Sequence, residues 1–317
     1  MDNVLVTGGA GFLGSYLVEK LLKKNKNVIA FDNGFRNSFV NIERLRNKKL
    51  TIIKGDVTKK EDWNQIPKNI DFAFHFAAIN GTKYFYEIPE KVIKVNVTGS
   101  MNFFNWILNT NIKQFFFASS SEVYGFPIIF PTPETEPLVV PDPTNPRFSY
   151  SSSKIIGEIT TINFAKTYGF SYTIGRFHNI YGPKMGFEHV IPEFIRKCVQ
   201  NEEFVVQGDG TESRSFCFIL DAIKAILLIC EKEEGRNEIF NIGNSEEVTI
   251  KNLIKMLEQI HGKKITPTFI PLKNSGTKRR FPDLTKIKKL GYEPQVSLNI
   301  GLKQTYDWYS SYYKNLQ

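Results

Sequence analysis

The chain has 317 residues, of which 41% are hydrophobic and 23% charged, a composition typical of a folded globular protein and not of a disordered one. The length suggests about two domains, or one large domain with a lobe. No apolar run is long enough to span a membrane, and the start, Met1-Asp2-Asn3, lacks the basic region of a signal peptide. We therefore expect a cytoplasmic protein with no membrane partner.

The net charge is +9, but the lysines are spread along the whole chain. Only Lys278-Arg279-Arg280 forms a tight cluster, so we expect no nucleic-acid partner. A small anionic substrate would account for the charge equally well. The three cysteines (Cys198, Cys217 and Cys230) are scattered, and none has the spacing of a zinc site. They predict reduced thiols and no metal.

Short β-rich runs alternate with helical patterns over the first part of the chain. Strands are predicted at 3–7, 27–31, 50–53, 71–76, 112–118 and 171–176, with helices at 12–23, 87–109 and 148–167. This alternation predicts an α/β fold with a parallel sheet. Apolar runs such as Phe115-Phe116-Phe117 favour a sheet that is covered on both faces.

The pattern is less regular after residue 177. Residues 126–147 are rich in proline and predict a surface loop, and helices are predicted at 219–230 and 250–260. We predict a Rossmann doubly wound parallel sheet formed by residues 1–176, to which a segment of about 211–242 returns. Residues 177–210 and 243–317 would form a smaller C-terminal lobe.

A glycine-rich loop, Thr7-Gly8-Gly9-Ala10-Gly11-Phe12-Leu13-Gly14, follows the first strand and opens the first helix. Glycines at Gly8 and Gly11 allow a tight turn and close approach of a pyrophosphate, and Gly14 allows close packing of helix on strand. The N–H groups at the helix start, including those of Phe12 and Leu13, favour phosphate binding. A glycine turn without a ligand is the alternative.

Asp32 ends the second strand, 18 residues after Gly14. A carboxylate there can accept hydrogen bonds from the ribose hydroxyls of NAD and repels a 2′-phosphate, so NAD is favoured over NADP. Asn33 and Ala77 follow strands at the same edge and are candidate cofactor contacts, as are Asp56 and Val57. Asp56 could instead cap the next segment.

Tyr150 and Lys154 are four residues apart and share one face of the predicted helix. A nearby ammonium group lowers the pKa of a tyrosine, which can then take a proton from an alcohol while hydride leaves for nicotinamide. Tyr16 and Lys20 have the same spacing, so the position of Tyr150 in the fold is what matters. Ser119-Ser120-Ser121 lie at the end of the fifth strand, where a hydroxyl can bind the reacting oxygen.

Together these motifs resemble the extended short-chain dehydrogenase/reductase family, and within it the nucleotide-sugar epimerases, dehydratases and decarboxylases. The resemblance runs from residue 3 to about residue 295. It also includes 176–183 (Arg-Phe-His-Asn-Ile-Tyr-Gly-Pro), 208–210 (Gly-Asp-Gly), Arg214 and Arg280-Phe281-Pro282-Asp283.

The resemblance implies that Tyr150 is the base, that Lys154 is its partner and also holds the nicotinamide ribose, and that Ser120 binds the reacting oxygen. It places Asn96 near the site, and Ser121 is a further candidate substrate contact. His178 stands where the family usually has Phe and could be a proton carrier or a substrate contact. The resemblance also implies that Asn179, Arg214 and Arg280 (or Arg279) hold the diphosphate of a nucleotide sugar, in a C-terminal lobe that binds substrate. His178 could equally be a packed core histidine.

The implied chemistry is oxidation of the sugar at C4 with NAD, in the synthesis of surface-glycan precursors. The product would be a 4-keto sugar or its C4 epimer. Glu122 leaves a 4,6-dehydratase open, because it could remove the C5 proton, and a non-catalytic protein that binds NAD is a third reading. Pairing through helices at 92–108 and 152–167 implies a homodimer or higher homo-oligomer.

Overall fold

The computed structural model describes residues 1–36, 38–271 and 277–315. They divide into two compact units. Unit 1 comprises Met1–Gly125, Leu138–Phe177 and Ile223–Phe240, and unit 2 comprises Phe126–Pro137, His178–Ala222 and Asn241–Gln317.

Unit 1 is built on a sheet of seven strands, counted over the described residues, in the order β11-β6-β5-β4-β1-β2-β3. The pairs from β3 to β6 are parallel. The predicted Rossmann-type α/β fold is therefore confirmed. The strands are β1 (Asn3–Thr7), β2 (Asn27–Asp32), β3 (Leu50–Lys54), β4 (Phe72–His75), β5 (Gln114–Ser120), β6 (Ser171–Phe177) and β11 (Glu238–Ile242).

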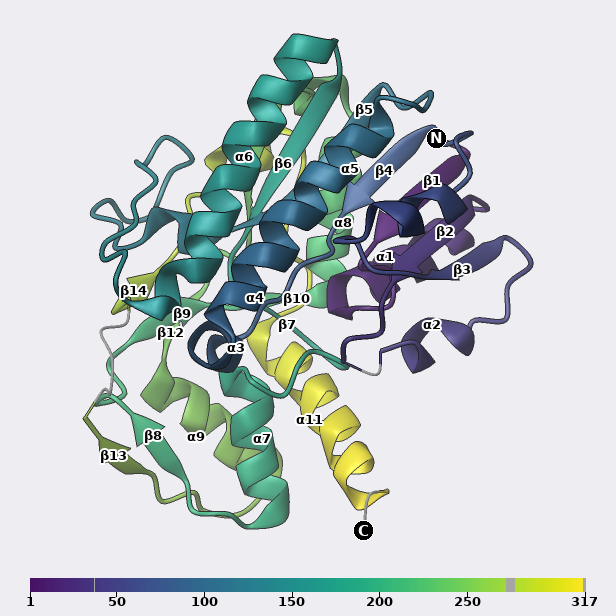
Figure 1. Ribbon diagram of the computed structural model, residues 1–317. Helices are drawn as coiled ribbons and strands as arrows, with labels where there is room; N and C mark the ends of the chain where they lie inside the picture. Colours follow the sequence, from purple (N-terminus) through teal and green to yellow (C-terminus); the bar gives the residue numbers. More distant parts are fainter. Residues whose placement is uncertain (37, 272–276, 316–317) are drawn as a thin grey trace. The chain divides into compact units, whose positions relative to one another are not determined.

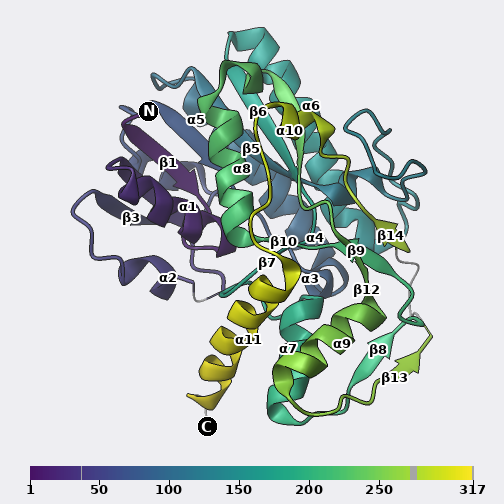
Figure 2. The same cartoon turned by 180° about the vertical axis from the view of Figure 1, so that it is seen from behind.

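Helices cover both faces of this sheet. α5 and α6 lie in front of it in Figure 1, and α1 and α8 lie in front of it in Figure 2, where the view is from behind. The helices of this region are α1 (Phe12–Lys23), α2 (Val40–Glu43), α3 (Thr82–Glu87), α4 (Pro89–Ile93), α5 (Gly99–Ile107), α6 (Ser149–Tyr168) and α8 (Ile219–Glu231).

The core of unit 1 is strongly aromatic because its strands have apolar side chains on both faces. Phe115, Phe116 and Phe117 are all fully buried on β5, as their unbroken apolar run predicted. Phe103 and Phe104 of α5 pack against Phe115 from one side. Each such ring contributes about 1.5–3 kcal/mol through burial, so these residues hold the helix layer on the sheet.

The single helix predicted at 87–109 is interrupted in the structure. α4 ends at Ile93, a π-helical turn spans Lys94–Thr98, and α5 starts at Gly99. The predicted continuous helix was wrong in this respect, because a π-turn inserts one residue without changing the apolar pattern much. Such turns are frequent at functional sites.

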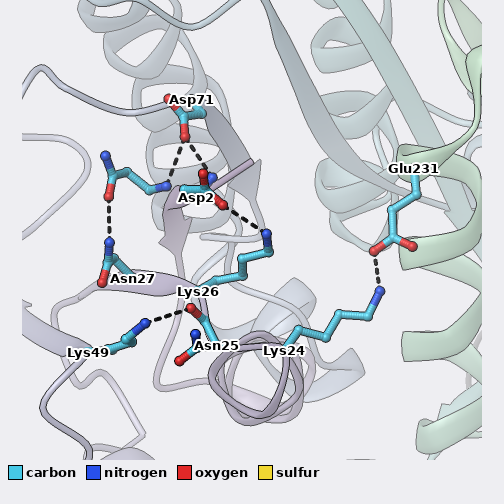
Figure 3. A network of polar contacts seen from close by, with 9 residues as sticks. Asp2, Lys24, Asn25, Lys26, Asn27, Lys49, Asp71 and Glu231 are labelled. Atoms are coloured by element: carbon cyan, nitrogen blue, oxygen red, sulfur yellow. Dashed lines mark hydrogen bonds and ion pairs between the residues drawn. The ribbon is translucent and has the colours of Figure 1, made fainter.

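The amino-terminal ends of the strands are joined by exposed polar contacts, shown in Figure 3. The Asp71 carboxylate accepts hydrogen bonds from the backbone N–H groups of Asp2 and Asn3, at 2.7 and 3.0 Å. Lys26 pairs with Asp2, and Lys24 at the end of α1 pairs with Glu231 at the end of α8. Exposed ion pairs of this kind contribute little to stability because solvent screens them. This edge is opposite the strand ends that carry the predicted site. We therefore assign these charged residues to the stability of the fold and not to the site.

Unit 2 contains helices α7 (Val190–Gln200), α9 (Ile250–His261), α10 (Thr285–Lys289) and α11 (Leu298–Lys314). Its short strands are β7 (Ile180–Tyr181), β8 (Val205–Gln207), β9 (Ser213–Ser215), β10 (Cys217–Phe218), β12 (Glu247–Thr249), β13 (Thr268–Ile270) and β14 (Arg279–Arg280). Over the part of the chain that the structure describes, β12, β9 and β14 form a three-stranded sheet. The patterns at 190–200 and 298–314 were not recognised as helical from sequence.

Candidate active site

The glycine loop lies where β1 and β4 run side by side. Gly8 has φ +68°, and a Cβ there would lie 2.8 Å from the backbone nitrogen of Ala77, just after β4. A Cβ on Gly14 would lie 2.1 Å from the carbonyl oxygen of Gly8. Glycine is therefore required at both positions. The loop forms a cradle of backbone at the carboxyl ends of the strands, which fits a pyrophosphate.

The first turn of α1 directly follows this cradle. The helix starts at Phe12 without a side-chain cap at Gly11, and the N–H groups of its first turn have no partner within the helix. Phe12 and Leu13 are partly exposed. An anion beside them gains both hydrogen bonds and the favourable end of the helix dipole.

Asp32 connects two of the loops at this edge. Its carboxylate accepts hydrogen bonds from the N–H groups of Ala10, at 3.1 Å, and Gly34, at 2.8 Å. Burial raises the pKa of Asp32, and the backbone hydrogen bonds oppose that rise. Arg36 donates to the carbonyl of Asn80 and lies over the ring of Tyr84. Arg36 is therefore engaged away from Asp32, which favours NAD over NADP.

Asp56 and Val57 lie in the turn after β3. The Asp56 carboxylate accepts from the N–H and the hydroxyl of Thr58, both at 2.8 Å, and from the Asn33 amide at 3.3 Å. Val57 is buried, and a Cβ on Gly99 would lie 2.6 Å from its side chain. These contacts explain both residues as parts of a well-packed turn; a contact with adenine stays a prediction.

Tyr150 and Lys154 lie on α6, which packs on β5 and β6. The Lys154 ammonium donates to the carbonyl of Ala118 at 2.7 Å and lies 5.8 Å from the centre of the Tyr150 ring. Phe85 stacks on Tyr150 with ring centres 4.9 Å apart. Ser120 hydrogen-bonds to the Tyr150 hydroxyl, and its own oxygen accepts the Glu122 N–H at 3.2 Å. The structure thus brings Ser120, Tyr150 and Lys154 together at the end of β5.

The electrostatics of this group differ from the expectation. Burial raises the pKa of Tyr150, as does the charge of Glu122, while the Ser120 hydrogen bond and Arg36 act in the opposite direction. Burial also lowers the pKa of Lys154 to about 8, although Glu158 opposes this. The expected lowering of the tyrosine pKa by lysine was wrong, because the ammonium is directed at the Ala118 carbonyl and desolvation dominates.

Glu122 lies in a short helical turn immediately after Ser120, and Ser121 beside it is buried. A carboxylate oxygen of Glu122 is 3.5 Å from a guanidinium nitrogen of Arg147, which lies just before α6. Both side chains are mostly buried, with 20% and 14% exposed. Arg147 therefore holds the Glu122 carboxylate where its charge affects Tyr150. Arg147 was not among the site residues predicted from the sequence.

Asn96 is buried within the π-helical turn. Its amide accepts the N–H of Ile79 at 2.8 Å and donates to the Ser153 hydroxyl at 3.0 Å. Asn96 thereby connects the loop after β4 to α6 between Tyr150 and Lys154. These bonds give it a role in positioning the site; contact with substrate stays a prediction.

In unit 2, the candidate residues lie around β7, β9 and β14. His178 is buried, and its Nε2 is 2.9 Å from the Asn241 side-chain oxygen. This favours the packed-histidine reading. Asn179 has φ +43° and donates to the Ser215 carbonyl at 3.3 Å. Its side chain therefore fixes a turn in the structure.

Arg214 and Arg280 are register partners in the neighbouring parallel strands β9 and β14. Partners in a parallel pair project from the same face, so two guanidinium groups share one side of a small sheet. The two positive charges repel each other, and an anion beside both would relieve that repulsion. Arg279 instead forms a bidentate pair with Glu247, at 2.7 Å for both contacts. Of the two alternatives, Arg280 is therefore better placed than Arg279 to bind an anion.

The model of the NAD dependent epimerase/dehydratase family matches residues 4–243. The chain belongs to this family.

Among the relatives is a UDP-N-acetyl-alpha-D-glucosaminuronate decarboxylase of Bacillus cytotoxicus. It is 32% identical over 96% of this chain and 97% of its own length. UDP-glucuronic acid decarboxylase 5 of Arabidopsis thaliana is 32% identical over 94% of this chain and 86% of its own.

Among solved structures, a UDP-glucose 4-epimerase of Thermotoga maritima with UDP-glucose has a TM-score of 0.88 and 33% identity. The alignment covers 99% of this chain and 100% of that one. A UDP-glucuronic acid 4-epimerase of Bacillus cereus, solved with NAD, has a TM-score of 0.89 at 28% identity, over 98% of this chain and all of the other.

These findings confirm the expected family and the expected cofactor, NAD. The chain is an enzyme of the NAD-dependent nucleotide-sugar epimerase, decarboxylase and dehydratase type. Within the described ranges, no helix is long and apolar enough to cross a membrane. Over the same ranges, no cluster of His, Cys, Asp or Glu could hold a metal ion.

Exchange of Asp32 for asparagine tests the cofactor site. Because Asp32→Asn removes the negative charge while keeping the shape, we expect NAD to bind about tenfold more weakly and NADP to be discriminated against less. Titration calorimetry with both cofactors measures this. Asp71→Asn, at the opposite edge of the sheet, is the control and should change neither affinity. Unchanged preference for NAD in Asp32→Asn would count against this site.

Proposed function

We propose that this enzyme oxidises the C4 hydroxyl of a nucleoside-diphosphate hexose or heptose to a ketone. Its product would be either the 4-keto sugar or the C4 epimer, in the synthesis of surface-glycan precursors. The observation that carries the proposal is the Ser120–Tyr150 hydrogen bond beside buried Lys154. This group lies at the same edge of the sheet as the glycine cradle, because β1 and β5 run parallel.

In the proposed reaction, Tyr150 first loses its own proton to solvent, and its phenolate oxygen then takes the proton of the C4 hydroxyl while the hydride of the C4–H bond leaves for NAD. Ser120, which is hydrogen-bonded to Tyr150, would also bind the C4 oxygen and so align it with the phenolic oxygen. NAD, when bound, supplies the hydride acceptor and a positively charged ring. Burial holds Tyr150 in its protonated form, so nearby positive charge is what would make it a base. Lys154, 5.8 Å from the centre of the Tyr150 ring, and Arg36, whose charge acts to lower the Tyr150 pKa, are described cations suited to that role.

The rest of the substrate would be bound by its diphosphate. Arg214 and Arg280 offer two planar cations on one face of their sheet, a pairing suited to phosphate oxygens. The names of the relatives support a UDP-sugar as substrate. We accordingly propose that unit 1 is the cofactor-binding part and that unit 2, which contains Arg214 and Arg280, is the part that binds substrate.

Replacement of Tyr150 by phenylalanine tests the proposed base. Tyr150→Phe keeps the stacking on Phe85 but cannot transfer a proton, so turnover should fall by about 10²–10⁴-fold. The measurement is mass spectrometry of products from a panel of UDP- and dTDP-sugars, with heptoses included. Tyr16→Phe is a matched control, because Tyr16 and Lys20 have the same spacing on α1.

Each product in that panel has a distinct meaning. Loss of two hydrogens indicates a net 4-dehydrogenase, and an unchanged mass with a new retention time indicates an epimerase. Loss of carbon dioxide indicates a decarboxylase. Full turnover by Tyr150→Phe would contradict the proposal, and no turnover by the wild type would favour a non-catalytic protein that binds NAD.

A second candidate function, a 4,6-dehydratase, is favoured by Glu122. Its carboxylate lies close enough to influence Tyr150 and is held by Arg147. A carboxylate there could remove the C5 proton once C4 is a ketone.

Glu122→Gln separates this candidate from the first one. A dehydratase run in deuterium oxide should lose the mass of one water and gain deuterium at C5, and the variant should lose that exchange while still oxidising C4. NMR of the product measures both. Asp142→Asn, an exposed acid in the loop before α6, is the control. Wild-type product without deuterium at C5 would rule out the dehydratase.

We also propose a homodimer, formed through α5 and α6. Ile93, Met101, Ile156 and Ile159 on α4, α5 and α6 are 43–54% exposed, and α4 and α5 both pack against α6. Together they make an apolar face that a second copy would cover.

Ile159→Glu should convert the dimer to a monomer, because it would bury a charge in that face. Light scattering at increasing concentration measures this. Ile128→Glu, at an isoleucine that is 88% exposed elsewhere, should leave the mass unchanged. A monomeric wild type would contradict the proposed pairing.

A further inference from the structure

The most completely buried charges in unit 1 belong to Glu158 and Arg176, and neither has a part in the reaction proposed above. Glu158 is 1% exposed and Arg176 is 3% exposed. Two guanidinium nitrogens of Arg176 donate to the two oxygens of the Glu158 carboxylate, at 2.9 and 2.7 Å. A buried pair of this kind is costly to desolvate, so its presence calls for a reason other than stability.

The pair is connected to the three segments that contain Lys154, Ser120 and Glu122. Glu158 is one helical turn after Lys154 on α6, and it accepts a hydrogen bond of 2.5 Å from Ser119, the neighbour of Ser120 on β5. Arg176 donates at 3.0 Å to the hydroxyl of Tyr124, which lies two residues after Glu122. The guanidinium also lies over the Tyr124 ring.

We propose that Glu158 is a positioning residue of this active site, one that sets the place of Ser120 through Ser119 and preserves the positive charge of Lys154. The inference rests on the proposed function for its effect on turnover. Its effect on Lys154 is independent of any substrate.

The positional part follows from geometry. The Ser120 hydroxyl must reach Tyr150, while the ammonium of Lys154 must reach the carbonyl of Ala118, the residue before Ser119. α6 and the end of β5 must therefore keep a fixed separation. The Glu158–Ser119 contact joins these two elements directly, and Arg176, from β6, holds the carboxylate from a third direction.

The electrostatic part follows from what surrounds Lys154. Burial favours the neutral amine, and the Ala118 carbonyl and the Phe117 ring, 5.2 Å away, offer only partial charges. His75 of β4 is neutral, because burial and the charge of Lys154 lower its pKa to about 3. Tyr150 is uncharged at neutral pH. The Glu158 carboxylate is the charge that opposes burial and raises the pKa of Lys154.

The experiment measures the pKa of the Lys154 side chain directly. The protein is labelled with ¹³C at lysine Cε, and the Lys154 signal is identified by its loss in Lys154→Met. The pH at the midpoint of its titration is then measured by NMR between about pH 6 and pH 11. We expect about 8 in the wild type and a value lower by about one unit in Glu158→Gln. Thr161→Val, a buried neighbour on α6, should leave it unchanged.

Two further variants keep the test decisive. Glu158→Asp retains the charge but is one methylene shorter, so the midpoint should stay near the wild-type value while kcat falls about tenfold with little change in KM. Glu158→Gln with Arg176→Met removes the pair together, which lets the chain fold even if the single variant does not. Its Lys154 midpoint should also fall, but by less than in Glu158→Gln, because the Arg176 cation is removed together with the Glu158 anion.

A wild-type midpoint in the folded double variant would overturn the electrostatic part. Full kcat in Glu158→Asp would overturn the positional part. Where activity can be measured, the basic limb of the kcat profile should move to lower pH in Glu158→Gln but not in Thr161→Val. Absence of any wild-type turnover would count against the proposed function alone, because the NMR result needs no substrate.

Discussion

The close approach of two backbones at Gly8 and Ala77 is the constraint on which the cofactor side of this enzyme depends. β1 and β4 are neighbours in the sheet although they are not consecutive in sequence, so their connections leave in opposite directions. The loops separate at this point and leave the strand ends open. Because no side chain fits at Gly8, the loop can pass close to Ala77 and enter α1 with its N–H groups facing that opening.

A second constraint holds Ser120, Tyr150 and Lys154 at the same edge of the sheet. The carboxylate of Glu158 connects α6, β5 and β6, and it is enclosed so completely that its hydrogen bonds have no competition from water. Interactions of this kind act on geometry more than on stability. Asn96 does the equivalent on the other side of α6, where its amide joins the Ile79 backbone to Ser153. The helix with Tyr150 and Lys154 is thus held at two points by buried polar side chains.

Much of the fold of unit 1 and the Tyr150–Lys154 pair could be predicted from the sequence, because each depends on residues that are close together in the chain. The strand at 3–7 and the helix at 12–23 have the predicted bounds, since a strand, a glycine turn and an amphipathic period lie next to each other. The proximity of Tyr150 and Lys154 could likewise be predicted, because both residues lie on one helix at a spacing of four residues.

What could not be predicted depends on residues far apart in the chain. The register of Arg214 with Arg280 joins strands of three and two residues, too short to recognise from their patterns. Glu158 was within reach, since it follows Lys154 by one turn, but its partner Arg176 comes from another strand. The helix at Leu298–Lys314 was missed because its many tyrosines are weak helix formers and obscure the apolar period.

The direction of the pKa shifts shows why residue type and spacing do not suffice for chemistry. Tyr150 and Lys154 have ordinary pKa values that lie close together, and a neighbouring ammonium should lower that of the tyrosine. Burial acts on both groups and in opposite directions, because it favours the neutral phenol and the neutral amine alike. A third group therefore has to preserve the positive charge of Lys154, and positive charge near Tyr150, such as that of Arg36, has to oppose the effect of burial on the phenol. Of the groups around Lys154, the buried carboxylate of Glu158 is the one that opposes burial and raises the pKa of Lys154.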